Sequence, residues 1–152
     1  MTDFVFNDYG VLTDGEIDLV VQLTEPSNPA TGQVPAYDFA VMLAGGREPV
    51  GRIGLRLGNT DHVVKYIGHI GYGIAEKHRG HGYAAKACRL ARPVAIDHGF
   101  RTLWITCNPD NYASRRTCEA LGCELVEIVD LPPDSDMYQR GERQKCRYRW
   151  AL

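Results

Sequence analysis

The stretch EKHRGHGYAAKA, from Glu76 to Ala87, decides how the rest of the sequence is interpreted. It follows an apolar run and leads into alanines at helical spacing, so it predicts a strand, a glycine-rich turn and a helix over 82–98. The first backbone amides of a helix have no partner inside it, and the helix dipole adds positive character there. Because Gly80 and Gly82 leave these amides uncovered, the turn is suited to binding a phosphate.

The side chains around this turn are basic, although the whole chain has a net charge of -2. They belong to Lys77, His78, Arg79, His81 and Lys86. Two common nucleotide-binding patterns do not fit, because no G-x-x-x-x-G-K-[ST] occurs and Ala85 replaces the last glycine of G-x-G-x-x-G. A tight strand-to-helix turn with a solvated basic surface is the alternative interpretation.

Length and composition indicate an ordinary globular protein. The chain has 152 residues, which predicts a single domain over residues 1–152. The slightly acidic charge argues against a nucleic-acid partner, and the lack of a long apolar run argues against a membrane span. The first ten residues show no signal peptide, and five cysteines without a close C-x-x-C pair favour reduced thiols in the cytoplasm over a metal site.

The remaining segments read mainly as strands. They lie, in chain order, at 16–23, 37–46, 49–59, 64–76, 102–108, 123–131 and 143–150. A second helix is predicted over 108–122, and 24–37 is predicted as a loop because it holds three prolines and no helical period. This order predicts an α+β (mixed α/β) fold with a mixed, mostly antiparallel central sheet of about six to seven strands and two main helices.

Two motifs resemble those of the GCN5-related N-acetyltransferase (GNAT) superfamily. The run Arg79-Gly80-His81-Gly82-Tyr83-Ala84 is similar to the family signature [Q/R]-x-x-G-x-[G/A], and NPDNYASRRTCEALGC resembles the later N-x-x-S-x-x-x-x-x-x-x-G helix. The resemblance covers roughly 51–129 and is nearest to the RimJ/RimL type. It implies a GNAT-like acyl-CoA N-acyltransferase fold, here lacking the usual N-terminal helices because 24–37 is a loop.

The resemblance also implies a function and a cofactor. In this family the glycine-rich loop holds the pyrophosphate of acetyl-CoA through backbone amides, and the strand before it pairs with the pantetheine arm. The implied cofactor contacts are Ile74, Ala75, Glu76, Arg79, Gly80, His81, Gly82, Tyr83, Ala84, Asn111 and Ser114. The implied reaction moves the acetyl group to a primary amine of a small molecule, an amino acid or a peptide or protein N-terminus.

The motifs leave several candidates for the proton-transfer groups. Many family members have a tyrosine acid seven residues after the motif asparagine, where this chain has Cys118, which either donates the proton or fills the core. Candidates for the base are His69, Tyr72 and Glu76, and Tyr138 is a more distant donor or a wall of the substrate site.

Two alternatives to an enzyme therefore stay open. A non-catalytic CoA-binding module would keep the loop without turnover, and an interaction protein would use the scaffold alone. The alternating final strand places four basic residues on one face, which either binds an acidic partner or is simply solvated. The short front end leaves the acceptor site open or completed by a second copy, so a homodimer is an expectation.

Overall fold

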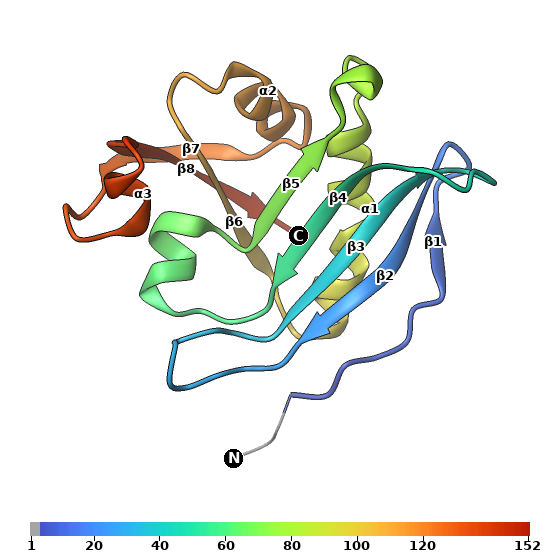
Figure 1. Ribbon diagram of the computed structural model, residues 1–152, viewed down its shortest axis with the longest axis horizontal. Coiled ribbons are helices and arrows are strands. Elements are labelled where there is room, and N and C mark those ends of the chain that lie inside the picture. The colour runs from blue at the N-terminus through green and yellow to red at the C-terminus, as the bar shows by residue number, and fades with distance from the viewer. Residues whose placement is uncertain (1–3) are drawn as a thin grey trace.

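The computed structural model describes residues 4–152 and contains two antiparallel sheets that meet at strands β5 and β6 (Figure 1). The first sheet has the order β1-β2-β3-β4-β5 and the second the order β6-β8-β7. The elements are β1 Val11–Thr13, β2 Ile17–Glu25, β3 Ala36–Leu43, β4 Pro49–Arg56, η1 His62–Ile67, β5 Ile70–Ile74, η2 Glu76–His78, α1 Tyr83–Asp97, β6 Thr102–Cys107, α2 Tyr112–Ala120, β7 Glu124–Asp130, α3 Asp136–Gln139 and β8 Gln144–Ala151. The predicted α+β class, the mainly antiparallel pairing and the two main helices are confirmed, with eight strands instead of six or seven.

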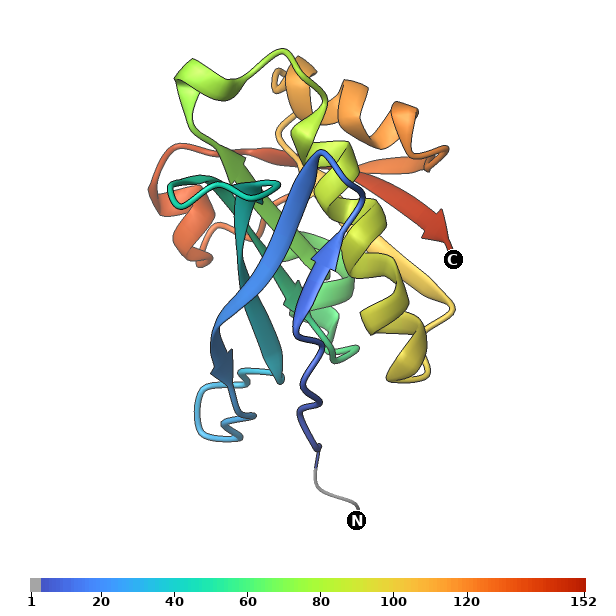
Figure 2. The same cartoon turned by 90° about the vertical axis from the view of Figure 1, so that its right-hand side faces the viewer.

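The first sheet has one buried and one open face. Alternate residues of its central strands point into the core, since Leu19, Phe39, Val41, Ile53 and Leu55 are almost fully buried. Helix α1 covers this face and packs against β2, β4 and β5 (Figure 2). Its buried side is built from small residues, which lets the helix lie close to the sheet.

The connection between β2 and β3 contributes no helix to the opposite face of the first sheet. The segment 26–35 contains only an isolated bridge between Asn28 and Gln33, so the predicted absence of the usual N-terminal helices is confirmed. None of the helices in residues 4–152 is long and apolar enough to cross a membrane.

The predicted strand over 64–76 is wrong in its first half. A π-helical turn, η1, replaces it, and β5 begins only at Ile70. The β-branched residues favoured a strand, but Thr60 begins a helical turn by accepting the amide of Val63 through its hydroxyl at 3.2 Å. Gly68 then ends the turn at φ 75°, where a side chain would lie 2.9 Å from the carbonyl oxygen of Trp104.

The basic face of the final strand is not free for an acidic partner. Arg147 pairs with Glu127 at 2.7 Å and stacks over Trp104, and Arg149 pairs with Glu124. Lys145 is only 8% exposed, which contradicts a fully solvated face. The chain itself neutralises most of the charge on this strand.

Candidate active site

A cavity of about 920 Å³ opens where β5 and β6 separate. The two strands are joined at one end by His69, whose amide donates to the carbonyl of Trp104 at 2.7 Å. Beyond this point β5 pairs only with β4 and β6 only with β8. Figure 1 shows the strands diverging towards the start of α1 and towards α2, so both helices border the opening.

The glycine-rich turn forms one end of the cavity. Among residues 4–152, no protein acceptor receives the amides of residues 80–84, and the helix start has no side-chain cap. Gly80 and Gly82 have φ values of 88° and 72°, and a side chain at either would meet no atom within 4 Å. This cluster of unpaired amides beside empty space fits the diphosphate of coenzyme A, as the motif predicts.

The side chains near the turn are arranged to leave it accessible. Arg79 lines the cavity, and its Nε donates to the carbonyl of Ile74 at 2.9 Å, which leaves its two terminal nitrogens without a protein acceptor in the described chain. His81 instead stacks against Tyr83, and Lys86 is paired with Glu16. The expected basic surface is therefore weaker than the sequence indicates, and Arg79 is its main contributor at the cavity.

Most of the implied cofactor residues line the cavity, but three do not. Those that do are Ile74, Arg79, Gly80, Gly82, Tyr83, Ala84, Asn111 and Ser114. His81, Ala75 and Glu76 lie outside the lining. The amide of Ala75 already donates to Val50 at 2.8 Å and its carbonyl accepts from His78, so this backbone is not available to a cofactor.

The register of β5 shows which amides are available. Ala75 bonds to Val50 and His69 to Arg56, so the bonded pairs of the ladder also include Gly71 and Gly73. In an antiparallel ladder the intervening residues point their backbone groups to the other edge, which here faces the cavity. The amides of Tyr72 and Ile74 are consequently the donors that this strand offers to a bound thioester or pantetheine arm.

Tyr72 and Ser114 form a hydroxyl pair within the cavity. The Tyr72 Oη lies 2.6 Å from the Ser114 Oγ and links β5 to α2. Asn111 positions α2 by accepting the amide of Ser114 at 3.2 Å as the helix cap. Burial raises the pKa of Tyr72, so its phenol stays protonated at neutral pH and is able to donate.

Cys118 does not reach the cavity. Its side chain is 0% exposed and belongs to the core between α1, α2 and the sheets. A hydrogen bond with Cys123 and burial both raise the pKa of Cys118. Of the two interpretations of this residue, the structure supports the small core residue over the proton donor.

His69 also does not line the cavity. It is 1% exposed, its Nδ1 accepts the amide of Trp104 at 2.8 Å, and its Nε2 lies 2.9 Å from Asn59 Oδ1. These bonds fix the tautomer with hydrogen on Nε2, and burial lowers the pKa to about 4. With both ring nitrogens occupied, His69 joins the two sheets and does not serve as the predicted base.

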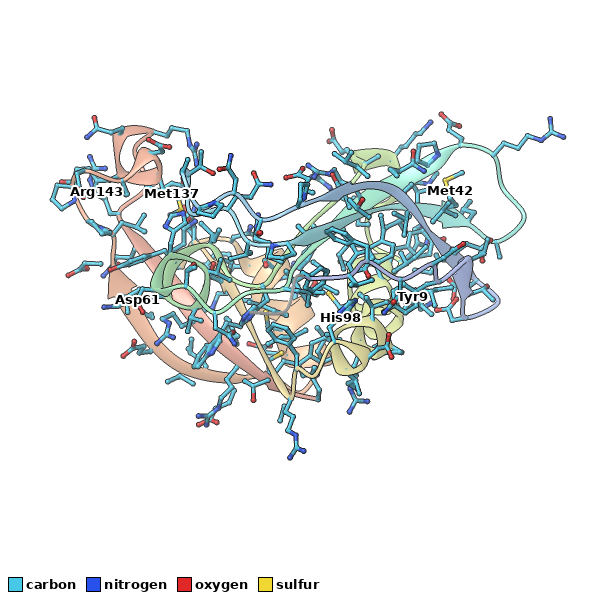
Figure 3. The ribbon with its side chains drawn as sticks, turned by 90° about the horizontal axis from the view of Figure 1, so that it is seen from below. Tyr9, Met42, Asp61, His98, Met137 and Arg143 are labelled. Carbon is cyan, nitrogen blue, oxygen red and sulfur yellow. The ribbon has the colours of Figure 1, made fainter. Side chains whose placement is uncertain are left out.

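The α3 loop contributes Met137 to the cavity instead of the predicted Tyr138 (Figure 3). The Tyr138 ring packs against Arg143, whose guanidinium carbon is 3.9 Å from the ring centre. Near Met137, Lys145 bonds to Glu142 and to Asn108, each at 2.7 Å. The hydrogen bond from Lys145 lowers the pKa of Glu142, so this carboxylate is charged.

Several cavity residues have no signal in a linear pattern. Arg56, Met137, Glu142 and Lys145 meet only through long-range pairing of the strands and the placement of the α3 loop. Within residues 4–152, no group of three or more His, Cys, Asp or Glu side chains is positioned to hold a metal ion.

The separation of β5 from β6 beside the unpaired amides at the start of α1 is the arrangement of an acyl-CoA-binding fold. A family model described as an Acetyltransferase (GNAT) domain matches residues 9–124. The chain therefore belongs to the GNAT acetyltransferase family, whose members use acetyl-CoA. No curated protein matches the sequence.

Solved structures show the same fold at low sequence identity. A putative acetyltransferase aligns with a TM-score of 0.70 and 14% identity, over 97% of this chain and 89% of its own. The microcin C7 self-immunity acetyltransferase MccE, in complex with acetyl-CoA and AMP, has a TM-score of 0.61 and 17% identity, over 77% of this chain and 61% of its own. RimJ from Mycobacterium smegmatis, in complex with CoA-disulfide, has a TM-score of 0.60 and 18% identity, over 81% of this chain. The chain spans 55% of the length of that RimJ, and less than two thirds of MccE.

Proposed function

We propose that this protein is an N-acetyltransferase that moves an acetyl group from acetyl-CoA to a primary amine. The unpaired amides of residues 80–84, at the end of the cavity, carry this proposal. The diphosphate would lie there, with Arg79 beside it, and the pantetheine arm would run along the open edge of β5. Such pairing uses backbone groups and adds a strand to the sheet.

The neutral amine attacks the thioester carbonyl, the C–N bond forms as the C–S bond breaks, and the proton lost from the amine nitrogen passes to water. The residues of the chain supply two further needs of this transfer. The thioester provides the activated acetyl group, whose carbonyl oxygen gains negative charge during attack, and the amide of Tyr72 or Ile74 is placed to stabilise that charge. The departing thiolate needs a proton. The Tyr72 hydroxyl donates it, while the Ser114 hydroxyl bonds to the Tyr72 oxygen and stabilises the charge that develops.

Turnover is the test of this proposal. Purified protein is mixed with acetyl-CoA and a panel of primary amines that includes amino acids, amino-acid amides, polyamines and short peptides, and free CoA thiol is measured. Amine-dependent release supports the enzyme. Binding of CoA in a calorimeter without release by any amine supports the alternative, a non-catalytic CoA-binding module.

The cellular setting and assembly are part of the proposal. All five cysteines are free thiols and four of them are buried, which supports a reducing compartment such as the cytoplasm. The uncovered face of the first sheet supports a homodimer in which a second copy covers it. Light scattering at several concentrations tests the dimer, and a monomer mass throughout would contradict it.

A further inference from the structure

The cavity has a second end, opposite the amide cluster, and one cation there has no carboxylate partner among the residues that the structure describes. Arg56 lies at the end of β4 and lines the cavity together with Tyr66 and Ile67 of η1 and Met137 of α3. Figure 3 shows Met137 and Asp61, the residue before η1, on the same side of the molecule, and residues of both segments line this cavity. If the cofactor fills the other end, as proposed above, this end is left for the acceptor.

Two other cations at this end share one carboxylate. Lys145 is paired with Glu142 at 2.7 Å, and Arg140 lies 3.4 Å from the same carboxylate. Arg56 has no ion pair within residues 4–152. Glu25 and Asp38 act on its charge only from beyond ion-pair distance. Arg56 therefore brings to a partly buried cavity a positive charge with no direct carboxylate partner in the described chain, and charge interactions there are stronger than in water.

The guanidinium of Arg56 is fixed in place before any ligand arrives. Its Nη1 donates to the carbonyls of Ile67 and Gly68, at 3.2 and 3.1 Å. Gly71 provides the flat surface under it, since a side chain there would lie 3.4 Å from Nη2 and 3.5 Å from Nη1. The Nη2 and Nε donors bond to no protein acceptor in the described chain, so two donors of a fixed fork remain for an anion.

We infer that the acceptor is an amine that carries a carboxylate, as a free amino acid does, and that Arg56 binds this carboxylate. A planar guanidinium with two free donors matches a carboxylate in a bidentate pair, and little flexibility is lost because the fork is already held. This inference rests on the proposed function, and it names the substrate class of the same cavity. Burial and the nearby Arg52 lower the pKa of Arg56, which a bound carboxylate would offset.

The experiment compares each amino acid with its own amide, which keeps the amine and side chain but removes the carboxylate charge. We expect the best amino acid to have a kcat/KM at least about 10-fold above that of its amide. Arg56→Gln should remove this preference by lowering kcat/KM for the acid at least about 10-fold, mainly through KM, while the amide changes less than about threefold. Arg56→Lys, which keeps the charge without the fork, should fall between the two.

Arg52→Gln is the matched control, because Arg52 lies on the same face of β4, pairs with Asp38 and does not line the cavity. It should leave the acid-to-amide ratio unchanged. Acetylation of amides as fast as of acids, or a preference that survives in Arg56→Gln, would overturn the inference while leaving the acetyltransferase proposal intact. Failure of every amine to release CoA thiol, despite CoA binding, would instead overturn both.

Binding of the product gives a readout that needs no turnover. N-acetyl derivatives of the same amino acid and amide are titrated into the CoA-saturated protein and followed by NMR. We expect the carboxylate form to bind at least about 10-fold more tightly, and Arg56→Gln to remove the difference. Equal binding of both forms to the wild-type protein would overturn the inference even if Arg56→Gln were too unstable to study.

Discussion

At the scale of single residues, the proposed mechanism gives the hydroxyl of Tyr72 the role that the family motif assigns to position 118. The thiol of Cys118 is enclosed in the core, whereas Tyr72 reaches the cavity and pairs with Ser114. The two residues come from elements far apart in the sequence, so no local pattern reveals the exchange. The motif correctly predicts α2, but the proposed proton donor comes from another strand, and only the folded structure shows which residue lies beside Ser114.

Replacing Tyr72 with phenylalanine tests the exchange. Tyr72→Phe keeps the ring and removes only the proton donor, so kcat should fall about 10- to 100-fold while CoA binding changes little. Burial raises the pKa of Tyr72 above its ordinary value of 10.0, so the acid should stay protonated and the wild-type kcat should not fall on the alkaline side up to about pH 10. A kcat in Tyr72→Phe equal to the wild type would rule out this role.

Cys118→Ala is the complementary change. Because Cys118 is a buried core residue, we expect less than about a tenfold loss of turnover and a small loss of stability, about 1 kcal/mol. Steady-state kinetics and urea unfolding measure the two effects. A loss of 100-fold or more in a variant that is still folded would instead make the thiol the catalytic acid.

At the scale of elements, the start of α1 carries the proposed cofactor site. Gly82 and Gly99 lie at opposite ends of this helix, both have positive φ, at 72° and 86°, and a side chain at either position would meet no atom within 4 Å. Alanine at either position meets the same unfavourable backbone conformation, which costs about 1–2 kcal/mol. Only Gly82 also adjoins the unpaired amides. Comparing the two alanine variants therefore distinguishes the effect of backbone strain on stability from the effect on CoA binding.

Gly82→Ala should therefore weaken CoA binding at least about 10-fold, whereas Gly99→Ala should lose similar stability and bind CoA as the wild type does. Isothermal titration calorimetry and thermal unfolding provide both quantities. Equal CoA affinity in the two variants would show that the turn before α1 is not the site.

Element prediction from the sequence succeeded where the signals are local. The glycine turn and the alanine spacing of α1 depend on neighbouring residues, and the structure confirms both. The strand predicted over 64–76 failed in its first half, because Thr60 and the contact of Gly68 with Trp104 outweigh the strand preference of the β-branched residues. The free amides of β5 and the position of Arg56 depend on pairing with β4, which no local pattern specifies.

At the scale of the whole molecule, His69 joins the two sheets at the closed end of the split. Its amide and its Nδ1 both bond to Trp104, so the imidazole extends the contact between β5 and β6 where the strands begin to part. The position that resembled a catalytic base from the sequence therefore ties β5 to β6 at the point where the two strands separate.

The burial of His69 makes the stability of the protein depend on pH. Burial lowers the pKa of His69 from 6.5 to about 4 in the folded state, so between these values the unfolded chain binds a proton that the folded chain does not. The contribution is fully present above about pH 6.5 and is lost as the pH falls towards 4, by about 3 kcal/mol in total. Urea unfolding at pH 7 and pH 5 should show a smaller pH dependence for His69→Gln; an identical dependence would contradict the effect.

The most direct measurement is a crystal structure of the protein with CoA bound. We predict that the diphosphate oxygens accept hydrogen bonds from the amides of residues 80–84, at about 2.7–3.2 Å, and that the pantetheine arm bonds to the backbone of β5 at Tyr72 and Ile74. The sulfur would then lie near the Tyr72 hydroxyl. A diphosphate bound elsewhere, with these amides unoccupied, would contradict the proposed acetyl transfer.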